Sequence, residues 1–297
     1  MILYFYFVII SVRRLTALAL LGSVLVGCAA DRPAPGPAAP SKAAAAGPPG
    51  AKPQQAVTPV FKRGALPKDA DGDEFNEYSD ESEFEGKTVA LTFDADMTAD
   101  QGRRALRGER FDNPTLVDAL RELKVPSTVF MTGRWAEEYP DQARAIGADP
   151  LFEVANHSYS HYAFTSKCYG LPQVAKSRML ADVNRGFAAI RKSGARNVVP
   201  YFRFPGGCYD DGALRAIAPA GVTAVQWDVV GGDAFAGDPD AVAEQVLEEV
   251  KPGSVVVLHC TRSAAPVTEQ ALRTIVPALR DRGYRMVKVS ELMKNRR

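Results

Sequence analysis

From Lys87 onward, short apolar runs rich in β-branched and aromatic residues alternate with stretches that carry apolar residues at helical spacing. Such runs are typical of buried strands, and the spacing between them is typical of amphipathic helices. The predicted strands are Thr88–Phe93, Ser127–Met131, Leu151–Ala155, Val199–Phe202, Val222–Trp227, Ser254–Leu258 and Tyr284–Val289.

The intervening helices have recognisable start signals. Asn113-Pro114 opens one helix and Asp238-Pro239 opens another. In each pair the polar residue can cap the helix, while proline suits its first position. A third amphipathic stretch covers Val174–Ile190. Strands and helices therefore alternate, as in a parallel sheet covered by helices.

Seven predicted strands in this order favour a closed or nearly closed α/β barrel over an open doubly wound sheet. No Gly-rich phosphate loop follows the first strand, which argues against a nucleotide-binding fold. We therefore expect a distorted (β/α)7 barrel, with parallel strands and outer helices, in residues 87–297.

Residues 1–28 have the pattern of an export signal. Two apolar runs, Met1–Ile10 and Leu15–Val26, flank Arg13-Arg14, and the second run leads into Cys28. This pattern is typical of a bacterial lipoprotein signal peptide whose cysteine becomes lipidated. We expect an exported protein, anchored to the cell membrane through Cys28. An uncleaved anchor or an ordinary secretory signal is the alternative.

Residues 29–86 are expected to link this signal to the barrel. As far as Pro59 the linker is mostly Ala, Pro and Gly, whereas Asp69–Glu85 is acidic and contains no basic residue. We interpret the acidic stretch as a solvated segment rather than a calcium loop, because its glycine stands at the wrong position. The formal net charge of +1 offers no electrostatic case for nucleic-acid binding.

The chain has only three histidines, and their placement indicates one site. His157 and His161 are four residues apart, so that one helical turn can bring them to the same metal, and His259 follows the apolar run of a predicted strand. Imidazole is a common zinc ligand and titrates near neutral pH. A close pair with a third histidine at a strand end predicts a metal site with a nearby proton donor.

Other polar residues also follow the predicted strands, at the point where each strand ends. The carboxyl ends of parallel barrel strands meet at one face, so side chains that are far apart in the sequence converge there. The residues at these ends are Asp94, Asp96, Asn156, His157, Arg203, Gly206, Gly207, Trp227, Asp228 and His259.

These residue types fit metal-assisted hydrolysis. His157, His161 and a carboxylate can hold a divalent metal that polarises a carbonyl and activates water. A second carboxylate can act as the base, oriented by Arg203. A backbone N–H near Gly206 can bind an oxyanion, and His259 can protonate the leaving group.

Five short motifs occur in order: Thr92-Phe93-Asp94-Ala95-Asp96, His157-Ser158-Tyr159-Ser160-His161, Arg203-Phe204-Pro205-Gly206-Gly207, Gln226-Trp227-Asp228 through Asp233, and Val257-Leu258-His259. Together they resemble the NodB-like polysaccharide deacetylases, carbohydrate esterase family 4, over about Thr88–Leu292. The resemblance implies that fold and a metal held by both histidines of the second motif.

The resemblance also assigns roles to single residues. It implies that Asp94 is the catalytic base, that Arg203 tunes it, and that His259 is the acid. The loop at Gly206 would supply an oxyanion N–H. Among substrate-binding residues, Leu258 would line the acetyl pocket, and Trp227 and Asp228 would form one wall of the groove; a plain core role is the alternative for Trp227.

Two positions depart from the family pattern. The family has adjacent aspartates in the first motif, whereas Ala95 separates Asp94 from Asp96 in this chain. Alternate strand residues face the same side, so we infer that Asp96 is the third metal ligand. The alternatives are Asp94 alone, or the two histidines with water. Val230 stands where the family has the aspartate that pairs with the catalytic histidine, and Asp228, two residues earlier, is the expected substitute.

Three cysteines, Cys168, Cys208 and Cys260, each follow one of the motifs. In an exported protein we expect them to form a disulfide or to pack in the core rather than to bind metal, and the sequence leaves their pairing open.

We therefore expect an exported, metal-dependent polysaccharide deacetylase that removes N- or O-acetyl groups from a cell-envelope or extracellular glycan resembling peptidoglycan, chitin or xylan. Zn2+ is the expected cofactor, and Co2+ or Ni2+ also suits the ligands. The alternatives are a non-catalytic glycan-binding lipoprotein on the same fold and a metal-dependent hydrolase of a non-sugar amide or ester.

Overall fold

The computed structural model describes residues 56–62, 86–98 and 100–294. The signal peptide expected in residues 1–28, including Cys28, lies outside these ranges, as do the acidic stretch and most of the linker. Within the described ranges, none of the helices has both the length and the apolar composition that a membrane span requires.

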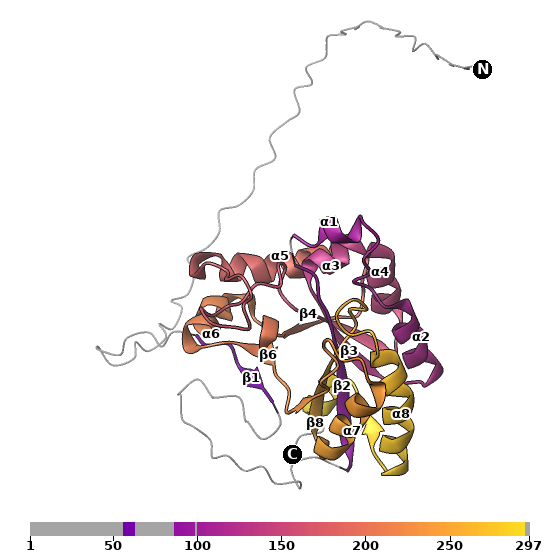
Figure 1. Ribbon diagram of the computed structural model, residues 1–297. Coiled ribbons are helices and arrows are strands. Elements are labelled where there is room, and N and C mark those ends of the chain that lie inside the picture. The colour runs from indigo at the N-terminus through magenta and orange to yellow at the C-terminus, as the bar shows by residue number, and fades with distance from the viewer. Residues whose placement is uncertain (1–55, 63–85, 99, 295–297) are drawn as a thin grey trace, which may run out of the picture. The chain divides into compact units, whose positions relative to one another are not determined.

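The described chain forms a parallel sheet with helices packed along it (Figure 1). The strand order is β1-β6-β5-β4-β3-β2-β8-β7, and β9 pairs with the beginning of β2. The strands are Val60–Phe61 (β1), Thr88–Ala95 (β2), Ser127–Met131 (β3), Phe152–Asn156 (β4), Val198–Phe202 (β5), Thr223–Val225 (β6), Val229–Val230 (β7), Ser254–His259 (β8) and Arg285–Met286 (β9).

The expected distorted (β/α)7 barrel is confirmed in the form of a curled half-barrel, whose edges in the described residues are β1 and β7. Every predicted strand overlaps an observed one, and β2, β4, β5 and β8 extend one or two residues beyond the predicted bounds. The strands β1 and β7 were not predicted, because two residues are too few to show alternation. β1 lies in the segment expected to be linker, where Val60 and Phe61 pair with Ala224 and Val225 of β6.

The predicted capping signals open two of the helices. The Asn113 side chain accepts a hydrogen bond from the Leu116 N–H, and that of Asp238 accepts one from the Asp240 N–H. The third predicted helix begins only at Met179, after a 3-10 turn over 176–178. The helices are Gly102–Ala105 (α1), Pro114–Glu122 (α2), Gly133–Glu138 (α3), Pro140–Ala148 (α4), Met179–Lys192 (α5), Asp211–Ile217 (α6), Pro239–Glu249 (α7), Thr268–Asp281 (α8) and Val289–Lys294 (α9).

Successive side chains of β2 point alternately to the two faces of the sheet and so belong to two hydrophobic clusters. We call the cluster on the face covered by α8 the outer cluster and the one on the other face the inner cluster. Leu91 and Phe93 pack in the outer cluster with Leu272 of α8, whereas Ala90 belongs to the inner cluster. Asp94 lies four residues after Ala90, so it continues the inner face at the carboxyl end of the strand. The fold thereby points a carboxylate into the half-barrel.

Candidate metal and catalytic site

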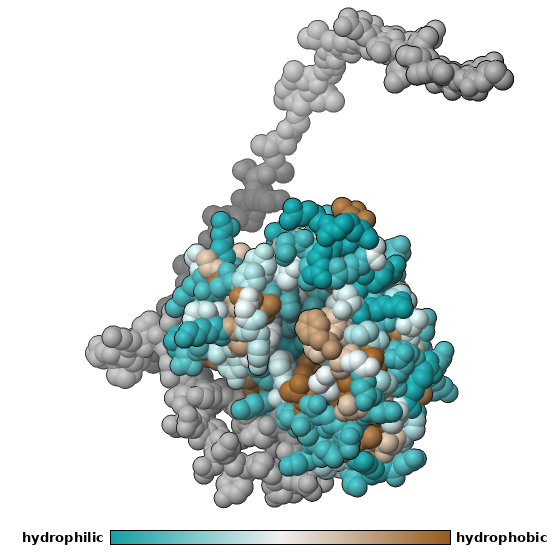
Figure 2. All heavy atoms as spheres, in the orientation of Figure 1, coloured by the Kyte–Doolittle hydropathy of each residue, from teal (hydrophilic) through white to brown (hydrophobic). Residues whose placement is uncertain are grey.

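The carboxyl ends of neighbouring strands meet where the sequence predicted them to. Asp94 of β2 is in register with Phe130 of β3 and with His259 of β8, and Asn156 of β4 is in register with Phe202 of β5. The face that carries these strand ends is hollowed near its centre (Figure 2). The side chains that the structure brings together there are those of Asp94, Asp96, His157, His161, Arg203 and His259.

Asp96, His157 and His161 form a group that can hold a metal ion, with one ligand atom from each within 4.8 Å of the others. The Asp96 Oδ1 atom lies 3.3 Å from Nε2 of His157 and 3.5 Å from Nε2 of His161. It is buried and accepts no hydrogen bond. Two imidazoles and a carboxylate around an unsatisfied oxygen fit a divalent transition metal.

The orientation of His157 supports this fit. Its Nδ1 lies 2.9 Å from the Arg203 carbonyl oxygen. A carbonyl oxygen can only accept a hydrogen bond, so Nδ1 carries the N–H, and in the neutral ring the lone pair on Nε2 is directed toward Asp96. Metal-binding histidines are oriented in this way, by donating their other ring N–H to a neighbouring oxygen.

The two histidines do not lie on a helical turn, as their spacing suggested, but on a loop after β4. Ser158 and His161 have φ values of 72° and 56° in the left-handed region. The Ser158 hydroxyl accepts the His161 N–H at 2.9 Å, and Asp182 accepts the Tyr159 N–H at 2.8 Å. These bonds hold a strained backbone that turns both rings to one point.

The titratable side chains of the metal group shift one another's pKa values. Burial by itself would raise the pKa of Asp96, but His161 and His157 outweigh it and hold that pKa well below its usual range. Burial opposes protonation of His157, yet Asp94 and Asp96 raise its pKa. For His161 burial prevails and lowers the pKa. The Asp96 carboxylate is therefore favoured in its ionised form.

Asp94 lies beside this group and is held by Arg203. The Arg203 Nη1 atom donates to Asp94 Oδ1 at 2.7 Å, and the Asp94 Oδ2 atom lies 3.6 Å from Nε2 of His157. Arg203 is fully buried, with its guanidinium 3.9 Å from the Phe130 ring centroid. Burial lowers the pKa of Arg203, and the ion pair with Asp94 counteracts this effect.

His259 faces the metal group from β8, with Nε2 3.9 Å from Asp96 Oδ2. Its Nδ1 lies 2.9 Å from Asp233 Oδ1, and Asp233 Oδ2 accepts the His259 backbone N–H and the Thr268 hydroxyl, both at 2.7 Å. Burial would lower the pKa of His259, but the bond to Asp233 outweighs it and raises the pKa to about 10. An imidazolium is therefore favoured at neutral pH.

The prediction that Asp228 stands in this site is wrong. Its carboxylate accepts the Ser254 hydroxyl and the Val255 N–H, each at 2.7 Å, at the amino end of β8. β7 runs parallel to β8 with Val229 opposite Val256, so Asp228 lies before the strand pair. Asp233 instead reaches His259, and its place in the fourth motif was the sequence signal for this.

The expected acetyl-pocket role of Leu258 is also wrong. The side chain is fully buried in the outer cluster that contains Leu272 and Val276 of α8. Adjacent strand residues point to opposite faces, so Leu258 points away from the face of His259. Val257, two residues before His259, lies on the site face, opposite Thr92. Strand alternation could have shown this from the sequence.

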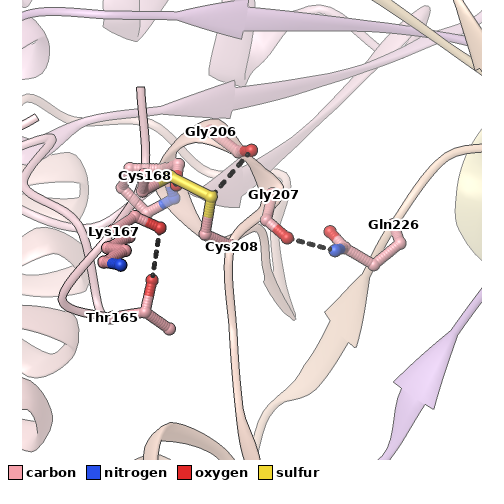
Figure 3. Close-up of a disulfide and its surroundings, with 8 residues drawn as sticks. Thr165, Lys167, Cys168, Gly206, Gly207, Cys208 and Gln226 are labelled. Atoms are coloured by element: carbon pink, nitrogen blue, oxygen red, sulfur yellow. Dashed lines mark hydrogen bonds between the residues drawn. A yellow bond between two sulfur atoms is a disulfide. The ribbon is translucent and has the colours of Figure 1, made fainter. Parts of the chain in front are cut away.

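A disulfide between Cys168 and Cys208 joins the loops that follow β4 and β5 (Figure 3). Gly206 and Gly207 lie between Arg203 and this disulfide, with φ values of 64° and 70°. The Gly207 N–H donates to the Phe204 carbonyl at 2.8 Å, so this N–H is not available to an oxyanion.

The loop is closely packed on both sides. A Cβ atom on Gly206 would lie 2.6 Å from Cys168 Sγ, and one on Gly207 would lie 2.5 Å from the half-buried Trp227. Trp227 also lies under the Arg203 guanidinium, 5.3 Å from ring centroid to Cζ. Cys260 is a buried free thiol in the outer cluster, where burial raises its pKa to about 12.

Comparisons with known proteins agree with this geometry. The family model for polysaccharide deacetylase matches residues 81–225. A chitooligosaccharide deacetylase of Sinorhizobium fredii is 35% identical over 181 residues, which span 58% of this chain and 80% of that protein. A peptidoglycan-N-acetylglucosamine deacetylase of Bacillus cereus is 28% identical over 184 residues, 61% of this chain and 81% of that protein.

The fold itself matches a solved structure from Bacillus anthracis that is described as a pseudoenzyme of carbohydrate esterase family 4. The TM-score is 0.57 at 25% identity, over 71% of this chain and 67% of that one. Because the fold occurs both in enzymes and in a pseudoenzyme, the chemistry has to be argued from the side chains of the site.

Proposed function

This chain belongs to the polysaccharide deacetylase family, and from that premise we propose that it is a metal-dependent deacetylase acting on glycans that contain N-acetylglucosamine. The observation that carries the proposal is the group of Asp96, His157 and His161 directly beside the Asp94–Arg203 ion pair. A ligand set and a separate carboxylate are what hydrolysis of an acetamide requires. The names of the related proteins supply the substrate class.

In this proposal Asp96, His157 and His161 hold the metal, with zinc as the first candidate. When bound, the ion would polarise the acetyl carbonyl and lower the pKa of water. Asp94 accepts the proton of the attacking water at Oδ2, since Arg203 occupies Oδ1. The ion pair with Arg203 keeps the carboxylate oriented until the proton arrives.

The remaining groups act on the acetyl oxygen and on the leaving nitrogen. The Gly206 N–H donates to the oxygen as negative charge develops on it. His259 enters as imidazolium and donates its Nε2 proton to the sugar nitrogen, while Nδ1–H stays bonded to Asp233. The C–N bond breaks, and the products are acetate and a free amine on the sugar.

The proposal is tested by measuring acetate release from the full chain with added zinc. The substrates are a chitooligosaccharide, N-acetylated peptidoglycan glycan and acetylxylan, and Asp94→Asn is the matched inactive variant. We expect release from the first two substrates and none from Asp94→Asn. Zinc binding without release from any substrate would favour the glycan-binding alternative, and release from a small acyl amide alone would favour the non-sugar hydrolase.

Export and attachment to the membrane through Cys28 belong to the same proposal, and the sequence pattern of residues 1–28 supports them. The test is to express the full chain and Cys28→Ser in a bacterium supplied with labelled fatty acid. We expect label and membrane association only with Cys28. Equal membrane association of both proteins would indicate an uncleaved anchor instead.

A further inference from the structure

Two aromatic rings protrude from the face that carries the catalytic groups. Tyr169 is 88% exposed and Phe235 is 85% exposed, far above the other aromatic side chains of the described residues. Tyr169 lies in the loop after β4, and Phe235 lies in the loop after β7. Hydrophobic side chains are visible around the hollow of this face (Figure 2). Exposed apolar side chains that gather around a hollow mark ligand-binding grooves.

Tyr169 lies against the proposed oxyanion donor. A Cβ atom on Gly206 would lie 3.2 Å from Cδ2 of Tyr169, so the ring covers the space that a side chain at position 206 would need. The preceding residue, Cys168, is tied to Cys208 two residues beyond Gly206 (Figure 3). The disulfide therefore holds the backbone of Tyr169 close to Gly206, next to the proposed oxyanion donor.

The backbone at Phe235 is held close to the residue that orients the proposed acid. Its N–H donates to the Ala264 carbonyl at 2.6 Å, and the Ala236 N–H donates to the Asp233 carbonyl at 3.2 Å. Asp233 is the residue that holds His259. Phe235 thus extends from the short turn that begins at this catalytic pair.

The loops that carry the two rings follow strands on opposite sides of β2. In the sheet, β4 and β5 lie on one side of β2, and β8 and β7 lie on the other. Tyr169 and Phe235 both have left-handed backbones, with φ values of 48° and 61°, which cost bulky residues free energy. In both loops the chain accepts strain and exposes an apolar ring.

We propose that Tyr169 and Phe235 are two sugar-binding platforms, which hold the units on either side of the one that is deacetylated. This inference rests on the proposed function and adds that the substrate is a chain of several sugars. The flat faces of a pyranose ring carry C–H groups, which pack on aromatic rings without any need for charge. A disaccharide engages at most one platform when its reacting unit is seated between them.

The test compares the full-length, zinc-loaded protein on a chitopentaose and on a chitobiose. Tyr169→Ala and Phe235→Ala should each reduce the preference for the pentasaccharide about 3- to 10-fold, mainly through a higher KM. Tyr169→Phe and Phe235→Tyr keep the ring and should retain the preference. Val57→Ala, at a half-exposed residue that precedes the edge strand β1, is the control. An unchanged preference in both alanine variants overturns the inference.

A second readout separates this inference from the proposed reaction. If the wild-type protein releases no acetate, calorimetric affinity for the chitopentaose decides the matter. Weaker binding by both alanine variants, with normal binding by the ring-conserving variants, supports the platforms while the reaction fails. Equal affinity in all variants, or no binding by the wild type, overturns the platforms.

Discussion

Asp96 is the residue on which the metal site depends. It follows Ala95, whose side chain is buried in the outer cluster, so the carboxylates at positions 94 and 96 both reach the inner side. The backbone after β2 is held by two bonds, from the Asp96 N–H to the Thr261 hydroxyl and from the Cys260 N–H to the Asp94 carbonyl. Ala95 between the two aspartates is therefore compatible with a ligand set of Asp96, His157 and His161.

We predict that Asp96→Ala weakens zinc binding by about 100-fold or more, because a ligand is lost outright rather than reoriented. Asp94→Asn should bind zinc about as well as the wild type, since Asp94 acts as the base. Competition with a chromophoric chelator measures both affinities. If Asp96→Ala kept wild-type affinity while Asp94→Asn lost it, Asp94 would be the ligand.

The contact between Asp233 and His259 leads to a prediction for how kcat/KM depends on pH. The Asp233 carboxylate stabilises the imidazolium and raises the pKa of His259 to about 10. In Asp233→Asn that pKa falls toward its usual value, so protonated His259 is lost at a lower pH. We predict that the alkaline limb of kcat/KM moves to lower pH in this variant. A limb at an unchanged pH would mean that another group is the acid.

At the scale of elements, the loop after β5 is built around Gly206. Gly206 and Gly221 both have a φ of 64°, but an added Cβ meets Cys168 Sγ at 2.6 Å in the first case and nothing within 4 Å in the second. Substituting alanine at each glycine therefore separates the cost of a left-handed backbone, which both sites share, from the cost of a steric clash, which only Gly206 has.

We predict that Gly221→Ala lowers the free energy of unfolding by about 1 kcal/mol, the cost of a left-handed backbone for alanine. Gly206→Ala should lower it by about 1–3 kcal/mol more, because the loop must also move away from the disulfide. Urea denaturation of both variants measures the difference. Equal losses of unfolding free energy in the two variants would show that the loop moves away from the disulfide without an energetic cost.

The strand β7 depends on Asp228, which binds the first residues of β8. We predict that Asp228→Ala lowers the free energy of unfolding by about 1 kcal/mol, the net worth of exposed charge-assisted bonds. Zinc affinity should stay unchanged, because the side chain lies at the far end of β8 from His259. A loss of zinc without a loss of stability would place Asp228 back in the site.

At the scale of the whole molecule, the metal group joins the loops after β2 and β4, so its occupancy bears on the stability of the fold. A ligand that binds only the folded state adds about 2.7 kcal/mol at a concentration of 100 times its Kd. We predict that a chelator lowers the Tm of the full chain and that zinc restores it. His161→Ala should show no zinc-dependent shift in Tm. A Tm independent of zinc in the wild type would argue against this site.

The sequence by itself determined the strands that carry the site and the residue types at their ends. Hydrophobic alternation and helix caps are local signals, so Ser127–Met131 and the caps at Asn113 and Asp238 could be identified without the fold. Convergence of Asp94 with His157 and His259 followed from the rule that parallel strands end at one face. These predictions needed no knowledge of which strand lies beside which.

Only the tertiary structure decided the partners of single side chains. The choice of Asp233 over Asp228 depends on how β7 is aligned with β8, and the pairing of Cys168 with Cys208 depends on how two loops approach. The short strand at Val60 likewise exists only because β6 offers an edge to it. Such contacts join residues far apart in the sequence, and no local pattern of polar and apolar positions records their geometry.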